Sequence, residues 1–563
     1  MLATRIRRLL PPLDWLPAYQ GSWLRPDVVA GLTTAAVVIP KAMAYATVAG
    51  LPVEVGLYTA FVPAVVYAVL GSSRALSVST TTTLAILAGA NLALVVPSGD
   101  PASLLTAAAT LAVLVGAILV AASILRLGFV ASFISEPVLI GFKAGIGLVI
   151  VLDQVPKLLG LHIGGGPFLQ KLLALVAHLP DTSAATLAVG AAMIAILVAL
   201  EHWVPRAPAP LVAVAVGIAA SGLAGLQQLG VDTVGHIPQG LPTFAPPRLD
   251  LVAALWPGAL GIALMSFTET IAAGRAFAAR GERRPDANQE LLATGVANAV
   301  GGLFGAMPAG GGTSQTAVNR QAGARTQLAA LVTAAATIAT LVLLAPAIGL
   351  MPQATLAAVV IVYSLGLIQL ADFRAILRTR SMEFRWAVIA CAGVVLLGTL
   401  KGILVAIVVS MVALSYQAAR PHLFVLGRKR GTDVFRPRSD EHPDDETFPG
   451  LLLARPEGRL FFANAQHVGE QLWPLLDEAQ PRVLALDLSA VPDIEYSALK
   501  MLTEGEEQLR DRGIALWLVA LNPEVLRMVQ RSPLGETLGR ERLVFTLQAA
   551  VERFLALPAP ARA

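Results

Sequence analysis

The sequence predicts a polytopic α-helical membrane protein that ends in a small cytoplasmic α/β domain. Composition is the first observation: of 563 residues, 56% are hydrophobic and only 14% are charged, and the mean hydropathy is +0.69, which excludes an ordinary soluble protein. The second is a series of about fourteen apolar segments before residue 420. The third is a change to polar sequence near residue 430, followed by alternating strand and helix patterns.

These patterns divide the chain into four parts. The first is an interfacial segment in which Trp15, Tyr19 and Trp23 act as headgroup anchors. The arginines near the start are not followed by an apolar stretch, so we expect no secretory signal and a cytoplasmic N-terminus. The parts are the N-terminal segment 1–26, the transmembrane domain 27–420, the linker 421–448 and the C-terminal domain 449–563.

The apolar segments of the transmembrane domain include several that are shorter than the ~20 residues of a straight span, which suits broken or buried helices. With the N-terminus inside, most arginines fall on cytoplasmic connections, and an even span number places both termini in the cytoplasm. The segments lie near 28–49, 54–70, 77–96, 105–125, 129–152, 184–201, 209–228, 256–277, 290–306, 312–320, 328–346, 353–370, 384–399 and 401–418.

Two features of this domain are out of place in hydrocarbon. Glu269 lies inside the apolar run Ala259–Ala273, where a charge costs roughly 2.5–3.5 kcal/mol and must face a partner or a wet cavity. The run Met307–Ser314 contains a proline and three glycines, which a continuous helix would not choose. We therefore expect a discontinuous helix that restarts near Thr313 and points its free N–H groups inward, forming an anion site.

The two halves of the domain echo each other, as an inverted repeat requires. Lys41 and Glu269 fall at similar depths in their segments, and the polar run Leu76–Thr83 corresponds to Gly310–Gln315. Two helix N-termini would then face one cavity. The alternative for the threonine run is an ordinary buried helix in which the hydroxyls bond to their own backbone.

Several motifs resemble the sulfate permease family of anion transporters, in the family's order and spacing. The resemblance implies a seven-plus-seven inverted repeat, with a core domain from spans 1–4 and 8–11, a gate domain from spans 5–7 and 12–14, and a homodimer in a bacterial inner membrane. The motifs are Ile39-Pro40, Ala42–Ala46, Gly50–Pro52, Gly56–Tyr58, Gly71–Arg74, Ser266–Glu269, Asn288–Leu292, Gly301–Gly305, Thr316–Asn319 and Gln321–Thr326.

Within the resemblance, the anion binds at the starts of the two half-helices, and Glu269 is the ion-coupling residue. Backbone N–H groups and hydroxyls there can replace part of an oxyanion's hydration shell. The expected substrate-binding residues are Ser79, Thr80, Thr81, Gly312, Thr313, Ser314 and Lys41.

The sequence departs from the family at two positions of this site. Many members have Arg in place of Gln315 and Gln in place of Lys41, so the positive charge has moved between repeats. Our hypothesis is that Lys41 pairs with Glu269 beside the anion, which would disfavour sodium and favour proton coupling or exchange. The alternative is that Lys41 snorkels to an interface and Glu269 is structural. Lys143, also basic in an apolar segment, is a weaker candidate.

These expectations describe a secondary-active transporter of sulfate, bicarbonate or a C4-dicarboxylate such as fumarate, working by alternating access. The alternatives are a sodium-coupled bicarbonate transporter, a nucleobase permease of the same fold, an anion channel or motor-like protein, and a substrate-sensing receptor. An enzyme is least expected: the chain has no P-loop and no metal-ligand spacing, so we expect no cofactor, no metal and no nucleic acid.

The C-terminal domain resembles the sulfate transporter and anti-sigma antagonist (STAS) domain carried by family members. We expect strands at Arg482–Leu488 and Ile514–Ala520, with helices at Ser497–Arg510, Pro523–Gln530 and Leu547–Leu555. A serine near Ser497 is phosphorylated in the anti-sigma antagonists. Here Ala498 replaces the usual glycine, and we expect Ser497 to be a helix N-cap.

Overall fold

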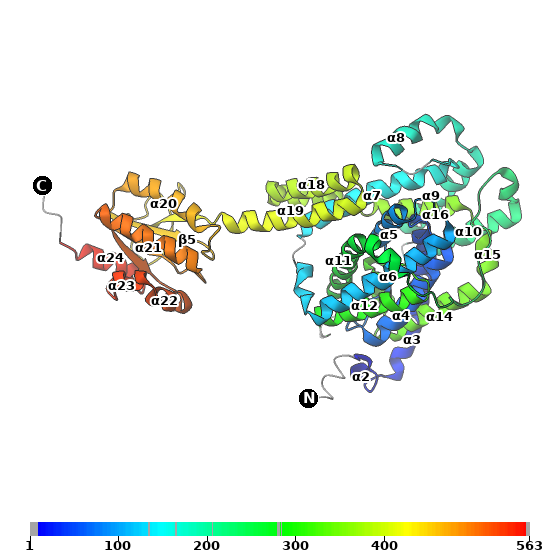
Figure 1. The fold of residues 1–563 in the computed structure, drawn as a ribbon, viewed down its shortest axis with the longest axis horizontal. Helices are drawn as coiled ribbons and strands as arrows, with labels where there is room; N and C mark the ends of the chain where they lie inside the picture. Colours follow the sequence, from blue (N-terminus) through cyan, green and yellow to red (C-terminus); the bar gives the residue numbers. More distant parts are fainter. Residues whose placement is uncertain are drawn as a thin grey trace. The chain divides into compact units, whose positions relative to one another are not determined.

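A computed structural model describes residues 10–132, 135–163, 166–204, 207–278, 282 and 284–558 (Figure 1). The chain forms two compact units, Met1–Met411 and Val412–Ala563. The first unit is almost entirely helical, whereas the second is built around a six-stranded sheet. Each unit has its own hydrophobic core, as separately patterned segments of sequence require.

The helical unit has the predicted inverted-repeat architecture. Seven of the described helices are long and apolar enough to cross a membrane, and others are shorter apolar helices, as expected for a bundle with broken spans. The helices that match the predicted segments are α3 (Gly21–Val48), α4 (Val53–Leu70), α5 (Thr82–Val95), α6 (Pro101–Ile124), α7 (Glu136–Leu159), α9 (Ala184–Trp203), α10 (Ala209–Ala224), α11 (Val252–Ala276), α12 (Ala287–Leu303), α13 (Thr313–Gln321), α14 (Leu328–Leu343), α16 (Gln353–Leu365), α18 (Ser381–Leu397) and α19 (Thr399–Ala419).

These helices pack in two groups. The core group consists of α3 to α6 and α11 to α14, and the gate group consists of α7, α9, α10, α16 and α18. Glycines allow close backbone approach in the core group: a Cβ on Gly116 of α6 would lie 2.6 Å from the Gly295 carbonyl oxygen of α12. Between the groups, α3 contacts α10 and α16. A residue on α3 can therefore touch both groups.

The start of the chain differs from the prediction. A short helix, α2 (Pro12–Trp15), is followed by α3, which begins at Gly21. The membrane helix thus includes residues that we assigned to the interfacial segment 1–26, and Trp15 is only 8% exposed. Trp15, Tyr19 and Trp23 form a chain of ring contacts, with centroid distances of 6.2 and 5.8 Å. Aromatic packing explains the burial of Trp15 better than headgroup anchoring.

Short helices that the hydropathy pattern did not predict connect the spans. Two of them, α8 (Phe168–Ala177) and α17 (Leu370–Thr379), are amphipathic, and one, α15 (Ala345–Gly349), is a short helix with a proline in its first turn. A pattern search for long apolar runs does not detect elements of this length.

The second unit is an α/β domain with the strand order β4-β3-β5-β6-β7-β8. Strands β5 to β8 are parallel, and β3 and β4 add an antiparallel edge. All five residues of β6 are buried, as expected for a strand covered on both faces. The elements are β3 (Leu423–Arg428), β4 (Phe435–Pro437), β5 (Leu451–Pro456), α20 (Ala465–Ala479), β6 (Val483–Asp487), α21 (Tyr496–Asp511), β7 (Ala515–Val519), α22 (Pro523–Gln530), α23 (Pro533–Leu538), β8 (Leu543–Val544) and α24 (Leu547–Leu555).

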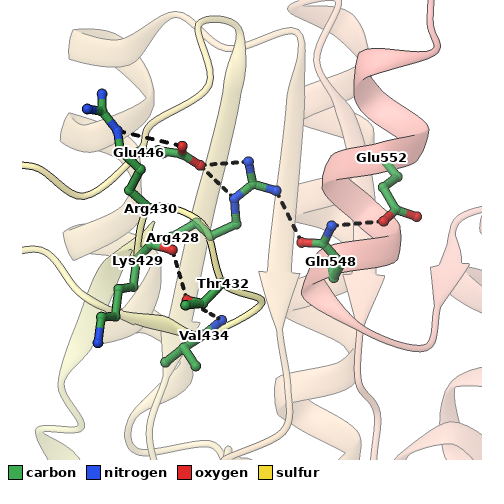
Figure 2. Close-up of polar contacts among 8 residues, drawn as sticks. All are labelled: Arg428, Lys429, Arg430, Thr432, Val434, Glu446, Gln548 and Glu552. Carbon is green, nitrogen blue, oxygen red and sulfur yellow. Dashed lines mark hydrogen bonds and ion pairs between the residues drawn. The ribbon is translucent and has the colours of Figure 1, made fainter.

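The predicted linker 421–448 is wrong as a structural description, because it contains β3 and β4. Figure 2 shows how this region is fixed: Arg428 Nε donates to Glu446 Oε2 at 2.8 Å and Arg428 Nη1 donates to Gln548 Oε1 at 3.2 Å. Gln548 lies on α24, so the guanidinium joins β3 to the last helix. The polar composition of this region reflects an exposed sheet edge.

The helix-capping prediction for Ser497 is also wrong. Helix α21 begins at Tyr496, its N-cap is Glu495, and no side chain caps it. Ser497 lies exposed in the first turn of the helix.

Candidate functional site

The two predicted chain breaks meet in a short backbone ladder. Strand β1 (Val78–Ser79) pairs antiparallel with β2 (Gly310–Gly311), with Val78 opposite Gly311 and Ser79 opposite Gly310. Helices α5 and α13 begin two to three residues later, at Thr82 and Thr313. The threonine run before Thr82 is therefore extended, and the alternative of a continuous buried helix is wrong. A Cβ on Gly311 would lie 2.7 Å from Thr270 Cα, so this ladder requires glycine.

Side chains of the core group satisfy the backbone of the second break. Met307 N donates to Thr59 Oγ1 at 3.0 Å, Ala309 N to Asn298 Oδ1 at 2.8 Å and Gly311 N to Thr270 Oγ1 at 2.8 Å. Irregular backbone within a membrane domain needs such partners, because hydrocarbon offers none. These hydrogen bonds stabilise the break and hold the start of α13 in place.

Further hydrogen bonds join the two half-helices to each other. Gly312 N donates to the Ser77 carbonyl at 3.1 Å, and Ser77 N donates to Thr316 Oγ1 at 3.1 Å. Ser79 Oγ donates to Gln315 Oε1 at 3.0 Å, while Gln315 Nε2 donates to the Ser77 carbonyl at 3.0 Å. The Gly312 N–H is therefore already used, and it is not the free anion donor that we expected from the sequence.

The two helix starts differ in how they are capped. Thr81 is the N-cap of α5, and its hydroxyl accepts from Leu84 N at 3.3 Å. Gly312 is the N-cap of α13 and has no side chain to accept such a bond. The first N–H groups of α13 have no intrahelical acceptor either, so its positive end stays available to an anion. Thr313 and Ser314, the first two residues of α13, have exposed side chains.

Lys41 supplies a full positive charge at the start of α13. Its Nζ atom lies 3.2 Å from Ser314 Oγ and 3.6 Å from the centroid of the Tyr363 ring. The residue is only 4% exposed, so the alternative in which Lys41 snorkels to an interface is wrong. Pro40 and Lys41 lie in the second half of α3, which packs against α13 and directs the side chain across to it.

Glu269 lies at the start of the other half-helix. Its Oε2 atom accepts a hydrogen bond of 2.7 Å from the Thr81 hydroxyl, and the residue is 8% exposed. Among the described residues no ion pair joins Glu269 to Lys41, so the predicted direct pair is absent. Each charged side chain instead reaches the half-helix of the opposite repeat. Lys41 of α3 contacts α13, and Glu269 of α11 contacts the residue that caps α5.

Thr80 is the remaining predicted donor between these charges. It is 2% exposed, and its Oγ1 atom has no hydrogen-bond partner in the part of the chain that the structure describes. A buried hydroxyl without a partner is costly, and a site that receives a ligand is one explanation. Lys143 lies half-buried on α7 in the gate group, and within the described ranges it has no hydrogen-bond or ion-pair partner.

One gate-group residue beside Lys41 was missed by the sequence analysis. The ring of Tyr363, on α16, has its centroid 3.6 Å from the ammonium. A tyrosine within the apolar segment 353–370 was the available signal, but its proximity to Lys41 depends on how α16 and α3 pack.

No group of three metal-ligating side chains occurs among the residues that the structure describes. The polar atoms at the two half-helices comprise one ammonium, one carboxylate, hydroxyls, amides and backbone N–H groups. This set can bind and release an anion and hold a proton. It offers no activated nucleophile.

Comparison with known proteins identifies both units. Residues 24–390 match the model of the sulfate permease family, and residues 442–550 match the STAS domain. The chain is 35% identical over 541 residues to a protein of Mycobacterium tuberculosis (strain ATCC 25618 / H37Rv) named "Probable sulfate transporter", covering 95% of this chain and 96% of that one. It is 30% identical to "Sulfate transporter 4.1, chloroplastic" of Arabidopsis thaliana, covering 97% and 82%.

Solved structures share the fold. The murine Slc26a9 anion transporter in its inward-facing state aligns with a TM-score of 0.90 at 24% identity, covering 98% of this chain and 95% of that one. The transmembrane domain of the cyanobacterial bicarbonate transporter BicA aligns with a TM-score of 0.62 at 21% identity, covering 70% and 98%. The architecture is therefore that of helical anion transporters with a C-terminal STAS domain.

Proposed function

The chain belongs to the sulfate permease family of anion transporters, and from that premise we propose that it is a secondary-active, proton-coupled carrier of sulfate that works by alternating access. Bicarbonate and C4-dicarboxylates are the competing substrates. The observation that carries the proposal is the Lys41 ammonium, 3.2 Å from Ser314 at the uncapped start of α13. We propose further that the carrier is a homodimer in a bacterial inner membrane with cytoplasmic termini.

The charges support an anion at α13. An oxyanion placed there would meet the first N–H groups of the helix, the hydroxyls of Thr313 and Ser314, and the Lys41 ammonium. The Thr80 hydroxyl is the donor left unused on the opposite side of the ladder. One full positive charge with neutral donors gives moderate affinity, which a carrier needs because it must also release its substrate.

Glu269 supports proton coupling. Its carboxylate accepts from Thr81 and thereby places a resident negative charge at the start of α5. A second negative charge arriving at α13 would be repelled by it, and a proton on Glu269 removes that repulsion. Binding of the proton and of the anion would then favour each other, which is the thermodynamic requirement of symport.

Reconstitution in liposomes tests both parts of the proposal. Uptake of labelled sulfate, bicarbonate and fumarate is followed under an inward proton gradient and, separately, under an inward sodium gradient. We expect sulfate uptake to be driven by protons in the parent and to lose that dependence in Glu269→Gln. Uptake driven by sodium alone would reject proton coupling, and uptake of only bicarbonate or fumarate would reject sulfate.

An electrical measurement separates a carrier from a channel. A channel would carry current far above the flux of labelled substrate, and a receptor would bind sulfate without uptake. Either result would overturn the proposal.

A further inference from the structure

Lys41 contacts both helix groups of the membrane unit. Its helix, α3, and its hydrogen-bond partner Ser314, on α13, belong to the core group, whereas Tyr363 lies on α16 of the gate group. The ammonium is 3.6 Å from the ring centroid, which is within the range of an attractive cation–π contact. The contact therefore joins the anion site to the group against which that site would move.

The lysine needs such a support. A lysine ammonium sits on a flexible four-carbon stem with a large rotamer entropy, so it does not hold one position without a partner. Among the described residues, no carboxylate lies within ion-pair distance of Lys41. The ring of Tyr363 and the hydroxyl of Ser314 are its defined contacts.

We propose that Tyr363 is a positioning residue that holds the Lys41 ammonium over the start of α13 in one conformation only, so that anion affinity depends on which side of the membrane the site faces. The inference rests on the proposed carrier function. Movement of the core group against the gate group separates Lys41 from Tyr363, because the two residues belong to different groups. The anion then meets a mobile ammonium and leaves more easily.

Sidedness of the Michaelis constant tests the inference. Labelled sulfate is used as the probe in proteoliposomes in which one orientation has been silenced by a membrane-impermeant reagent, and KM is measured from each face. We expect the two values to differ about tenfold in the parent. Tyr363→Leu and, as a second variant of similar volume without a branch, Tyr363→Met should raise the lower KM to the level of the higher one. Tyr363→Phe keeps the ring and should keep the difference.

Lys41→Gln provides the matched background. Adding Tyr363→Leu to Lys41→Gln should change neither KM further, because the ring then has no cation to hold. A merely structural tyrosine would lower the maximal rate or the thermal stability and move both KM values together, with or without Lys41. That result, or a sidedness that survives in Tyr363→Leu and Tyr363→Met, would overturn the inference.

Failure of this inference is distinguishable from failure of the proposed function. If the parent takes up no sulfate, the proposed function is wrong. If the parent transports sulfate and the two faces respond equally to loss of the ring, only the role of Tyr363 is wrong.

Discussion

The two half-helices α5 and α13 begin with matching backbone geometry, but the charged side chains beside their first turns have opposite sign. Helix α5 is capped by the Thr81 hydroxyl, which also donates to Glu269, so a carboxylate already occupies the neighbourhood of its positive end. Helix α13 has only Gly312 at its N-cap and has Lys41 beside it. The same dipole therefore binds a resident anion in one repeat and is open to a mobile one in the other. Symmetry of the fold does not imply symmetry of the site.

The largest expected effect comes from removing the charge at α13. Lys41→Gln should weaken sulfate binding about a hundredfold, because a charge-assisted contact contributes up to ~3 kcal/mol. The measurement is KM for labelled sulfate in proteoliposomes. A change below about threefold would mean that the backbone of α13 binds the anion without Lys41.

A compensating variant sharpens this result. Lys41→Gln combined with Gln315→Arg places the positive charge on α13 itself and should recover at least about tenfold in affinity. Gln315→Arg alone is the control, since it adds a second cation to the parental site. Absence of recovery would show that the position of Lys41, and not only its charge, determines binding.

The next effect concerns α5. Glu269→Gln keeps the size of the side chain and an acceptor for Thr81 but removes the proton-binding group. We expect uptake to become independent of the proton gradient and to fall about tenfold under an inward gradient, because the gradient then does no work on the anion. Uptake is compared with and without the gradient. Coupling that persists in this variant would assign the proton to another residue.

A smaller effect tests whether the unpartnered hydroxyl belongs to the site. Thr80→Val is nearly isosteric and removes a hydroxyl that has no partner among the described residues, so the folded state should lose no stability. Sulfate affinity should fall about fivefold if the hydroxyl contacts the anion, which corresponds to one hydrogen bond of ~1 kcal/mol. Thermal denaturation of the same variant is the control. If sulfate affinity is unchanged while thermal stability increases, the Thr80 hydroxyl does not contact the anion.

The smallest effect concerns the junction between the halves. A Cβ on Gly312 would lie 2.5 Å from Gln315 Nε2, the end of a flexible side chain, and the backbone φ of −84° accepts alanine. Gly312→Ala should therefore fold but displace Gln315 from Ser79, with a loss of about threefold in KM through distortion of the pair. Ser79→Ala removes the same hydrogen bond without a clash and should give a similar value. A much larger loss in Gly312→Ala would point to a contact of the anion with Gly312 itself.

The sequence predicted the parts of this site whose presence in a membrane carries a large free-energy cost. A buried charge such as Glu269 and a break such as Pro308 to Gly312 are expensive in a membrane, so their presence in an apolar segment is by itself a sign of function. The positions of the half-helices followed from the repeat, whereas the predicted pairing of Lys41 with Glu269 did not occur: each contacts the half-helix of the other repeat. The core and gate groups were expected from the family resemblance, and the central STAS strands from their apolar sequence pattern.

Other features could not be read from residue patterns. Whether Lys41 meets Glu269 or Tyr363 depends on side-chain directions across three helices, and periodicity carries no such information. The Gly312 N–H was expected to be free, but the register of β1 with β2 gives it the Ser77 carbonyl. In the STAS domain, the polar residues around the short edge strand β4 resembled a linker, although β3 beside it has the apolar sequence LFVLGR.

The ladder between β1 and β2 has a consequence for how such a carrier can be modified. It is made of main-chain hydrogen bonds, and its geometry requires small residues on one strand but no particular charge nearby. The β1–β2 ladder, which positions the starts of α5 and α13, therefore does not depend on which neighbouring side chain supplies the positive charge. Under the proposed function, we expect changes at Lys41 or Glu269 to alter selectivity or the driving ion while the ladder keeps its shape, whereas Gln315 is bonded to Ser79 and to the Ser77 carbonyl and so helps to join the two half-helices.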